Sequence, residues 1–273
     1  MTGKSVAFNV IEIIGLVGAL IIIFTAVFSP SIQRLPTWYL LLCSSAAYSF
    51  SMLLLAMAHK QFGAEPDFAL CLVQGTLIYA CPIWLMASVC AFALQFHLAV
   101  LFYIKKYSGS ISHESKWIPL SAVIVFIGVA GILLVGIVQP QIVQRDSEHF
   151  YCHFTHNIGT YIAGALIVAF AITAFTFQYN QSNGTCSINV MVRLAAYSLV
   201  SILSMFTSTL NVLPNVKNFD DIILSYSTVT VAGVFVLGIN MSIIRAWMFW
   251  KDDTTAGRDI QVKVERSSNT SAV

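Results

Sequence analysis

Long apolar runs alternate with short polar or proline-containing breaks along the chain. Because an α-helix rises 1.5 Å per residue, about 20 largely apolar residues cross the hydrocarbon core of a bilayer. Irregular backbone is not tolerated in lipid, so such runs must form helices packed in one bundle. We predict one all-α domain, 1–250, followed by a disordered tail, 251–273. Its seven transmembrane helices are expected at about 6–28, 38–58, 71–103, 117–138, 157–179, 192–213 and 222–250.

The composition is that of a membrane protein. Of the 273 residues, 58% are hydrophobic and only 10% are charged, whereas an ordinary soluble domain has about a quarter charged residues. A water-soluble fold is therefore excluded, and the lipid bilayer is the first expected partner. The formal net charge is +2, and the Lys and Arg residues are spread thinly. No nucleic acid is expected as a partner, because phosphate recognition needs concentrated cations.

The cations near the helix ends predict how the bundle is oriented, because the richer side normally stays in the cytoplasm. One side carries only Lys4, Lys60, Arg145 and Lys217. The other side also holds the C-terminus, so an odd number of spans places the N-terminus outside. We expect a multi-pass plasma-membrane protein with a cytoplasmic tail. The cations of the richer side are Arg34, Lys105, Lys106, Lys116, Arg193, Arg245, Lys251, Arg258, Lys263 and Arg266.

Two cysteines fall in segments that this orientation places outside. Cys71 begins the third predicted helix, and Cys152 lies between the fourth and fifth. Disulfides persist in oxidising compartments, so we predict a Cys71–Cys152 bridge that holds the outer loop over the mouth of the bundle. The chain-entropy estimate for closing a loop of this size is about 4 kcal/mol or more. The alternative is a pair of free thiols.

These features together resemble the G protein-coupled receptor superfamily: seven helices, an outside N-terminus, and a third-helix cysteine bridged to the second outer loop. More narrowly, Leu70-Cys71-Leu72-Val73-Gln74, the in-helix Pro82 and Tyr151-Cys152 are similar to motifs of uncharacterised fungal seven-helix receptors. The resemblance implies signal transduction: a plasma-membrane receptor, not an enzyme, that senses an unknown extracellular ligand and activates a heterotrimeric G protein.

The chain departs from rhodopsin-like receptors at three motifs. Counting from Cys71, their Asp-Arg-Tyr triplet falls on Gln95-Phe96-His97, which lacks the arginine. The seventh helix keeps Asn240 of Asn-Pro-x-x-Tyr but has Met and Ile at the Pro and Tyr positions. The second predicted helix, 38–58, has no carboxylate for a sodium site. The chain therefore falls outside the rhodopsin-like class, and these motifs do not identify its switching residues.

The main alternative is a seven-helix transporter of small molecules or lipids. Transporters usually show broken helices or polar groups near the midplane, and this chain has few of either. Retinal binding needs a seventh-helix lysine for the Schiff base, and 222–250 contains none. We expect no cofactor and no metal. The histidines that come closest to a metal-binding pattern, His149, His153 and His156, lie in a loop, and the sequence has no HExxH pair.

A few residues within the predicted helices are candidates for ligand binding. Glu12 is an ionisable group about two turns into the first helix, where a carboxylate faces inward and is available to a cationic ligand group. On the third helix, Gln74, Ile78, Pro82 and Leu85 follow the spacing of one face and are expected to line the upper cavity. Pro82 frees a backbone carbonyl and is a predicted hinge. The alternatives are snorkelling of Glu12 and ordinary helix packing.

Four cations are expected around the inner mouth of the bundle. Lys105 and Lys106 end the third helix, Arg193 opens the sixth and Arg245 closes the seventh. A positively edged pocket there is suited to the C-terminal helix of a Gα subunit, whose terminal carboxylate is negative. The alternative is that these cations only direct membrane insertion.

Overall fold

The computed structural model describes residues 3–29, 34–63, 65–104, 117–136, 143–145, 151–154, 158–182, 227–228, 231–238 and 243. Within these residues there are five α-helices, two short strands and one π-helical segment. The α-helices are α1 (Gly3–Phe28), α2 (Pro36–Met57), α3 (Phe68–Ile104), α4 (Trp117–Gly136) and α5 (Ile158–Ser182). The strands are β1 (Val143–Arg145) and β2 (Cys152–Phe154), and the π-helix is η3 (Val234–Gly238).

Three of these helices are long and apolar enough to cross a membrane: Ser5–Phe28, Pro36–Met57 and Phe68–Leu98. Shorter apolar stretches occupy α4, at Ile118–Gly131, and α5, at Tyr161–Phe177. The expectation of a mainly helical fold is thus confirmed over the described residues, and three of the helices have the length and apolar composition that a membrane span needs. The full set of seven spans and the outside N-terminus stay predictions. The sixth expected helix, 192–213, lies outside the described residues, as does most of the seventh.

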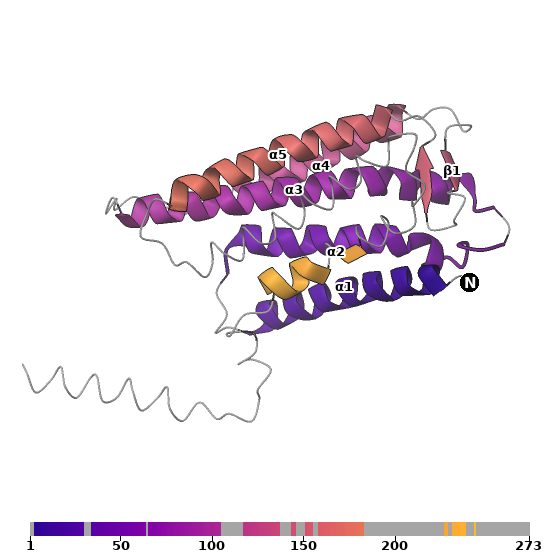
Figure 1. The fold of residues 1–273 in the computed structure, drawn as a ribbon, viewed down its shortest axis with the longest axis horizontal. Helices are drawn as coiled ribbons and strands as arrows, with labels where there is room; N and C mark the ends of the chain where they lie inside the picture. Colours follow the sequence, from indigo (N-terminus) through magenta and orange to yellow (C-terminus); the bar gives the residue numbers. More distant parts are fainter. Residues whose placement is uncertain are drawn as a thin grey trace, which may run out of the picture.

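The helices lie side by side along the long axis of the molecule (Figure 1). Helix α3 is the central element, since it packs against α2, α4 and α5, while α1 packs against α2. The N-terminus and the β1–β2 pair lie at the same end of the bundle (Figure 1), which we call the hairpin end. The chain alternates direction from helix to helix, so the α2–α3 connection also lies at the hairpin end.

The inner face of α1 explains how the first helix packs. Its buried positions recur every three or four residues, which gives one face to the bundle and leaves large apolar side chains exposed on the other. Val234 of η3 contacts this buried face: a Cβ added to Gly18 would lie 2.9 Å from its Cγ1 atom. Gly18 therefore permits the close approach of η3 to α1. The buried residues of this face include Ser5, Phe8, Glu12, Ala19, Ile22 and Ala26.

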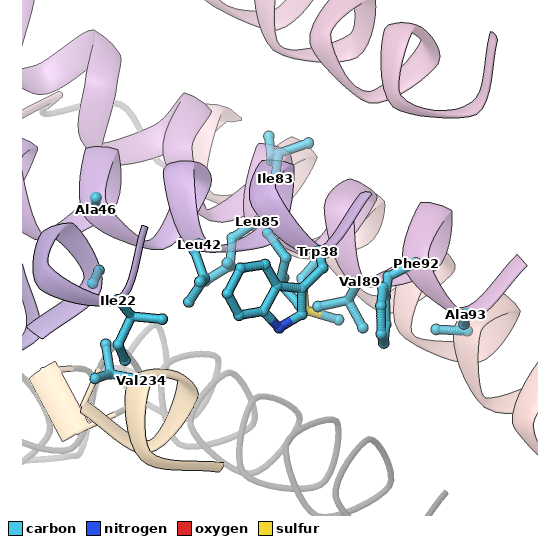
Figure 2. Close-up of a cluster of buried hydrophobic side chains, with 14 of the residues drawn as sticks. Ile22, Trp38, Leu42, Ala46, Ile83, Leu85, Val89, Phe92, Ala93 and Val234 are labelled. Atoms are coloured by element: carbon cyan, nitrogen blue, oxygen red, sulfur yellow. The ribbon is translucent and has the colours of Figure 1, made fainter. Parts of the chain in front are cut away.

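A main apolar core joins α1, α2, α3, α5 and η3. Trp38 and Leu42 of α2 lie between Ile22 on one side and the side chains of α3 on the other (Figure 2). Small residues such as Ala19 and Ala46 belong to the same cluster. Small side chains let helices approach closely, which is the usual source of helix association in a bilayer.

Helix α3 continues through Pro82 without a break, from Phe68 to Ile104. Proline has no backbone N–H, so the carbonyl of Ile78, four residues earlier, loses its normal helical partner. Neighbouring helices can compensate for such a defect inside a bundle. The structure thus places the predicted hinge residue within the central helix, while hinge motion itself stays a prediction.

Candidate functional site

A disulfide joins the first turn of α3 to the segment between α4 and α5. It links Cys71 to Cys152, the first residue of β2, with the two Cα atoms 5.2 Å apart. Both cysteines are buried. The predicted pairing is therefore present, and it fixes β2 against the hairpin end of α3.

The two short strands form an antiparallel pair that covers this end of α3. Val143 lies opposite Phe154, and Arg145 lies opposite Cys152. The guanidinium of Arg145 donates from Nη1 to the carbonyl of Lys60 at 3.3 Å and from Nη2 to that of Gly63 at 3.1 Å. These bonds attach β1 to the α2–α3 connection. The β1–β2 pair is thus tied to the helices at both strands, and we call it the hairpin.

The hairpin also inserts an aromatic side chain against α3. The ring of Phe154 stacks on that of Tyr79, with the ring centroids 5.0 Å apart. Gly75 lies one turn before Tyr79 and provides the space, because a Cβ there would be 3.2 Å from Cε1 of Phe154. Leu55, Cys71, Val143 and Cys152 complete the buried apolar cluster around Phe154.

Gln74 connects the hairpin to two helices through its side-chain amide. Its Oε1 atom accepts the backbone N–H of Cys152 at 3.0 Å, and its Nε2 donates to the carbonyl of Ser51 in α2 at 3.1 Å. The side chain is fully buried. From its spacing, Gln74 was expected to line a ligand cavity, whereas in this conformation both ends of its amide bind protein atoms.

The other expected ligand-binding residues lie in different environments. Ile78 packs against a small cluster formed by Phe8, Tyr48, Met52 and Cys81, and Leu85 is buried in the main core. Glu12 is fully buried on the inner face of α1. All three therefore lie toward the bundle interior, and their contact with a ligand stays a prediction.

Sequence reasoning missed several polar contacts that join the helices. Asn9 of α1 and Gln61 after α2 exchange hydrogen bonds between their amides, at 2.9 and 3.4 Å. At the opposite end of the bundle, the hydroxyl of Thr37 donates to Oε1 of Gln95. The signal available in the sequence was a polar side chain inside an apolar run, but the partner is distant along the chain and only packing identifies it.

The four cations expected at the inner mouth, Lys105, Lys106, Arg193 and Arg245, lie outside the described residues. The described cation nearest to them in the predicted topology is Arg34, whose guanidinium lies 5.5 Å from the centre of the Trp38 ring. His97 is one of the three residues at the position of the Asp-Arg-Tyr triplet of rhodopsin-like receptors. Its ring centroid lies 5.9 Å from that of Phe177 in α5. The α3–α5 contact at this end is thus aromatic.

Among the residues whose positions are described, no group of three or more His, Cys, Asp and Glu side chains is arranged to hold a metal ion. The histidine cluster between α4 and α5 is only partly covered, since His149 and His156 lie outside these residues. Comparison with known protein families and with characterised proteins finds no match for the chain. Function must therefore be inferred from the residues and their geometry.

Proposed function

We propose that the chain is a G protein-coupled receptor of a class distinct from the rhodopsin-like receptors. The observation that carries the proposal is the disulfide between Cys71, in the first turn of the central helix, and Cys152 of the hairpin. A covalently held outer segment over a membrane helix bundle is an arrangement suited to receiving an extracellular ligand. The proposed receptor resides in the plasma membrane and responds to an extracellular ligand of unknown identity.

The proposed orientation puts the hairpin end outside the cell. Disulfides persist in oxidising compartments, so the bridge supports an extracellular hairpin and, with it, an extracellular N-terminus. The distribution of Lys and Arg supports the same orientation independently, because the opposite side of the predicted bundle is richer in cations.

The proposed signal is a shift between two packings of the bundle, for which a coupling free energy of about 1–3 kcal/mol is typical. Pro82 in the central helix and the π-helical turn η3 support this, since both interrupt regular helical hydrogen bonding. The ligand is proposed to act on the inward-facing Glu12, Ile78 and Leu85. At the other end, the proposed Gα-facing surface consists of Lys105, Lys106, Arg193 and Arg245.

The test is co-expression of the full chain with a panel of Gα subunits in membranes, followed by measurement of nucleotide exchange with and without a library of candidate ligands. We expect exchange on at least one Gα to exceed that in membranes lacking the chain. A chain confirmed at the cell surface that leaves every Gα at its basal rate under all conditions would remove G protein coupling from the proposal.

A further inference from the structure

Two buried residues of α3 contact the same short segment of α2. Gln74 and Cys81 are seven residues apart and therefore lie on one face of α3, two turns apart. Gln74 donates to the carbonyl of Ser51, while Cys81 packs against Tyr48 and Met52. The segment 48–52 of α2 therefore contacts α3 at two positions, Gln74 and Cys81, which are two helical turns apart.

Ser51 takes part in the contacts at both positions. Its hydroxyl donates to the carbonyl of Tyr48 at 2.7 Å, and Tyr48 belongs to the same buried cluster as Cys81. Ser51 thus binds Gln74 through its backbone carbonyl and, through its hydroxyl, the backbone of Tyr48 beside Cys81. A single residue of α2 therefore connects both contacts.

The turn of α3 between these contacts is the one that Pro82 weakens. The carbonyl deprived of a helical partner belongs to Ile78, midway between Gln74 and Cys81. Ile78 itself packs against the cluster of Tyr48, Met52 and Cys81. The α2 segment 48–52 therefore contacts α3 on both sides of the weakened turn, and we call this segment the brace. Gln74, which bonds the brace, also accepts a hydrogen bond from the backbone of β2.

We propose that this set of contacts couples the hairpin to the proline hinge. The chain of contacts runs from the Cys152 amide through the Gln74 side chain to Ser51, and then through Tyr48 to Cys81 beside Pro82. We call this chain of contacts the relay, and Gln74 is its positioning residue. When the hairpin moves, the hydrogen bond from Gln74 to the carbonyl of Ser51 changes. The contacts between the brace and the weakened turn of α3 then become weaker. The coupling is a property of the protein itself and does not depend on G protein activation.

A coupling free energy is reciprocal, so a variant that weakens the relay near Pro82 must also lower the local stability of the hairpin. The variant Ser51→Ala removes the hydroxyl that bonds Tyr48 but leaves the carbonyl that binds Gln74. Its control is Ser44→Ala, because Ser44 is equally buried on α2 and its hydroxyl also bonds a carbonyl three residues earlier, that of Leu41 at 2.9 Å. The two variants thus differ chiefly in whether the lost hydroxyl touches the relay.

Amide hydrogen exchange in the full-length protein in nanodiscs, read by mass spectrometry, reports local opening at each site. In Ser51→Ala we expect exchange about three- to tenfold faster around Pro82, the range for one lost hydrogen bond, and a smaller acceleration at the hairpin. Ser44→Ala is expected to leave both at the parent rate. Hairpin exchange in Ser51→Ala equal to that in the parent, with α3 accelerated, would overturn the coupling.

A second variant approaches the relay from the hairpin side. Gln74→Met keeps the length of the side chain but removes both hydrogen bonds, and Val73→Ala on the exposed face is its control. Acceleration at the hairpin and around Pro82 together supports the relay. Acceleration at the hairpin alone means that Gln74 only fixes β2, which overturns the proposal. If Gln74→Met does not fold, the Ser51→Ala comparison still decides.

Discussion

The ring of Phe154 occupies the space into which a side chain at Gly75 would project. A Cβ at residue 75 would lie 3.2 Å from Cε1 of that ring, and the ring is held in place by stacking on Tyr79. Neither side can yield easily, because Phe154 is buried among residues of α2, α3 and the hairpin. Residue 75 therefore sets how closely the hairpin approaches the central helix.

Replacing Gly75 with Val is expected to destabilise the protein by about 1–3 kcal/mol, the usual cost of overpacking a buried site. The measurement is thermal unfolding of the purified protein. Gly128→Val in α4 is the control, because nothing lies within 4 Å of a Cβ there. Combining Phe154→Ala with Gly75→Val should destabilise the protein by less than the sum of the two single changes, because the ring that the new side chain meets is then absent. Equal melting temperatures for Gly75→Val and Gly128→Val would contradict the close contact.

A second close contact joins the first helix to η3. A Cβ on Gly18 would lie 2.9 Å from Cγ1 of Val234, so Gly18→Ala should destabilise the parent but have less effect once Val234→Ala has created room. A double-mutant cycle in chemical or thermal unfolding should give a coupling energy of at least about 0.5 kcal/mol. Additive effects would show that η3 does not press on α1 at this point.

The disulfide variants Cys71→Ser and Cys152→Ser are expected to behave alike. The bridge spans 81 residues, for which the chain-entropy estimate is about 4.5 kcal/mol, so each variant should unfold at a clearly lower temperature than the parent. Reductant should lower the melting temperature of the parent and leave both variants unchanged. Alkylation of both thiols in the non-reduced parent, detected by mass spectrometry, would remove the bridge.

The orientation is tested by glycosylation, which occurs only on the luminal side. The acceptor triplets Asn180-Gln-Ser, Asn183-Gly-Thr and Asn269-Thr-Ser are all predicted to be cytoplasmic and should carry no glycan. An acceptor triplet in an added N-terminal extension should be modified and serves as the positive control. Glycosidase-sensitive mass on any one of these three triplets would reverse the topology.

The proposed Gα-facing surface is tested by removing one charge at a time. Arg193→Gln and Arg245→Gln should each keep the orientation, since the remaining inner cations still outnumber the outer ones. Each should also reduce nucleotide exchange on any Gα that responds to the parent. Full activation by both variants at matched surface levels would mean that these cations serve only membrane insertion.

The sequence by itself determined where the helices of the described region form. A helix in lipid satisfies its own backbone hydrogen bonds, so a run of apolar residues between polar breaks is enough to specify one. The expected segments 38–58 and 117–138, for example, agree with α2 (Pro36–Met57) and α4 (Trp117–Gly136) to within two residues at each end. The disulfide partners were also accessible, because Cys71 and Cys152 were the cysteines left on one side of the predicted membrane.

Only the tertiary structure decided what the side chains inside the bundle contact. Ser44 and Ser51 are the same residue type with the same local hydrogen bond, yet only Ser51 bonds a residue, Tyr48, that packs in the cluster of Cys81, and only Ser51 joins the proposed relay. Gln74 was predicted to face a cavity, and it instead bridges the hairpin and α2. The spacing of residues gives the face of a helix, but its rotation and tilt depend on packing against its neighbours, and these decide which distant residue each side chain meets.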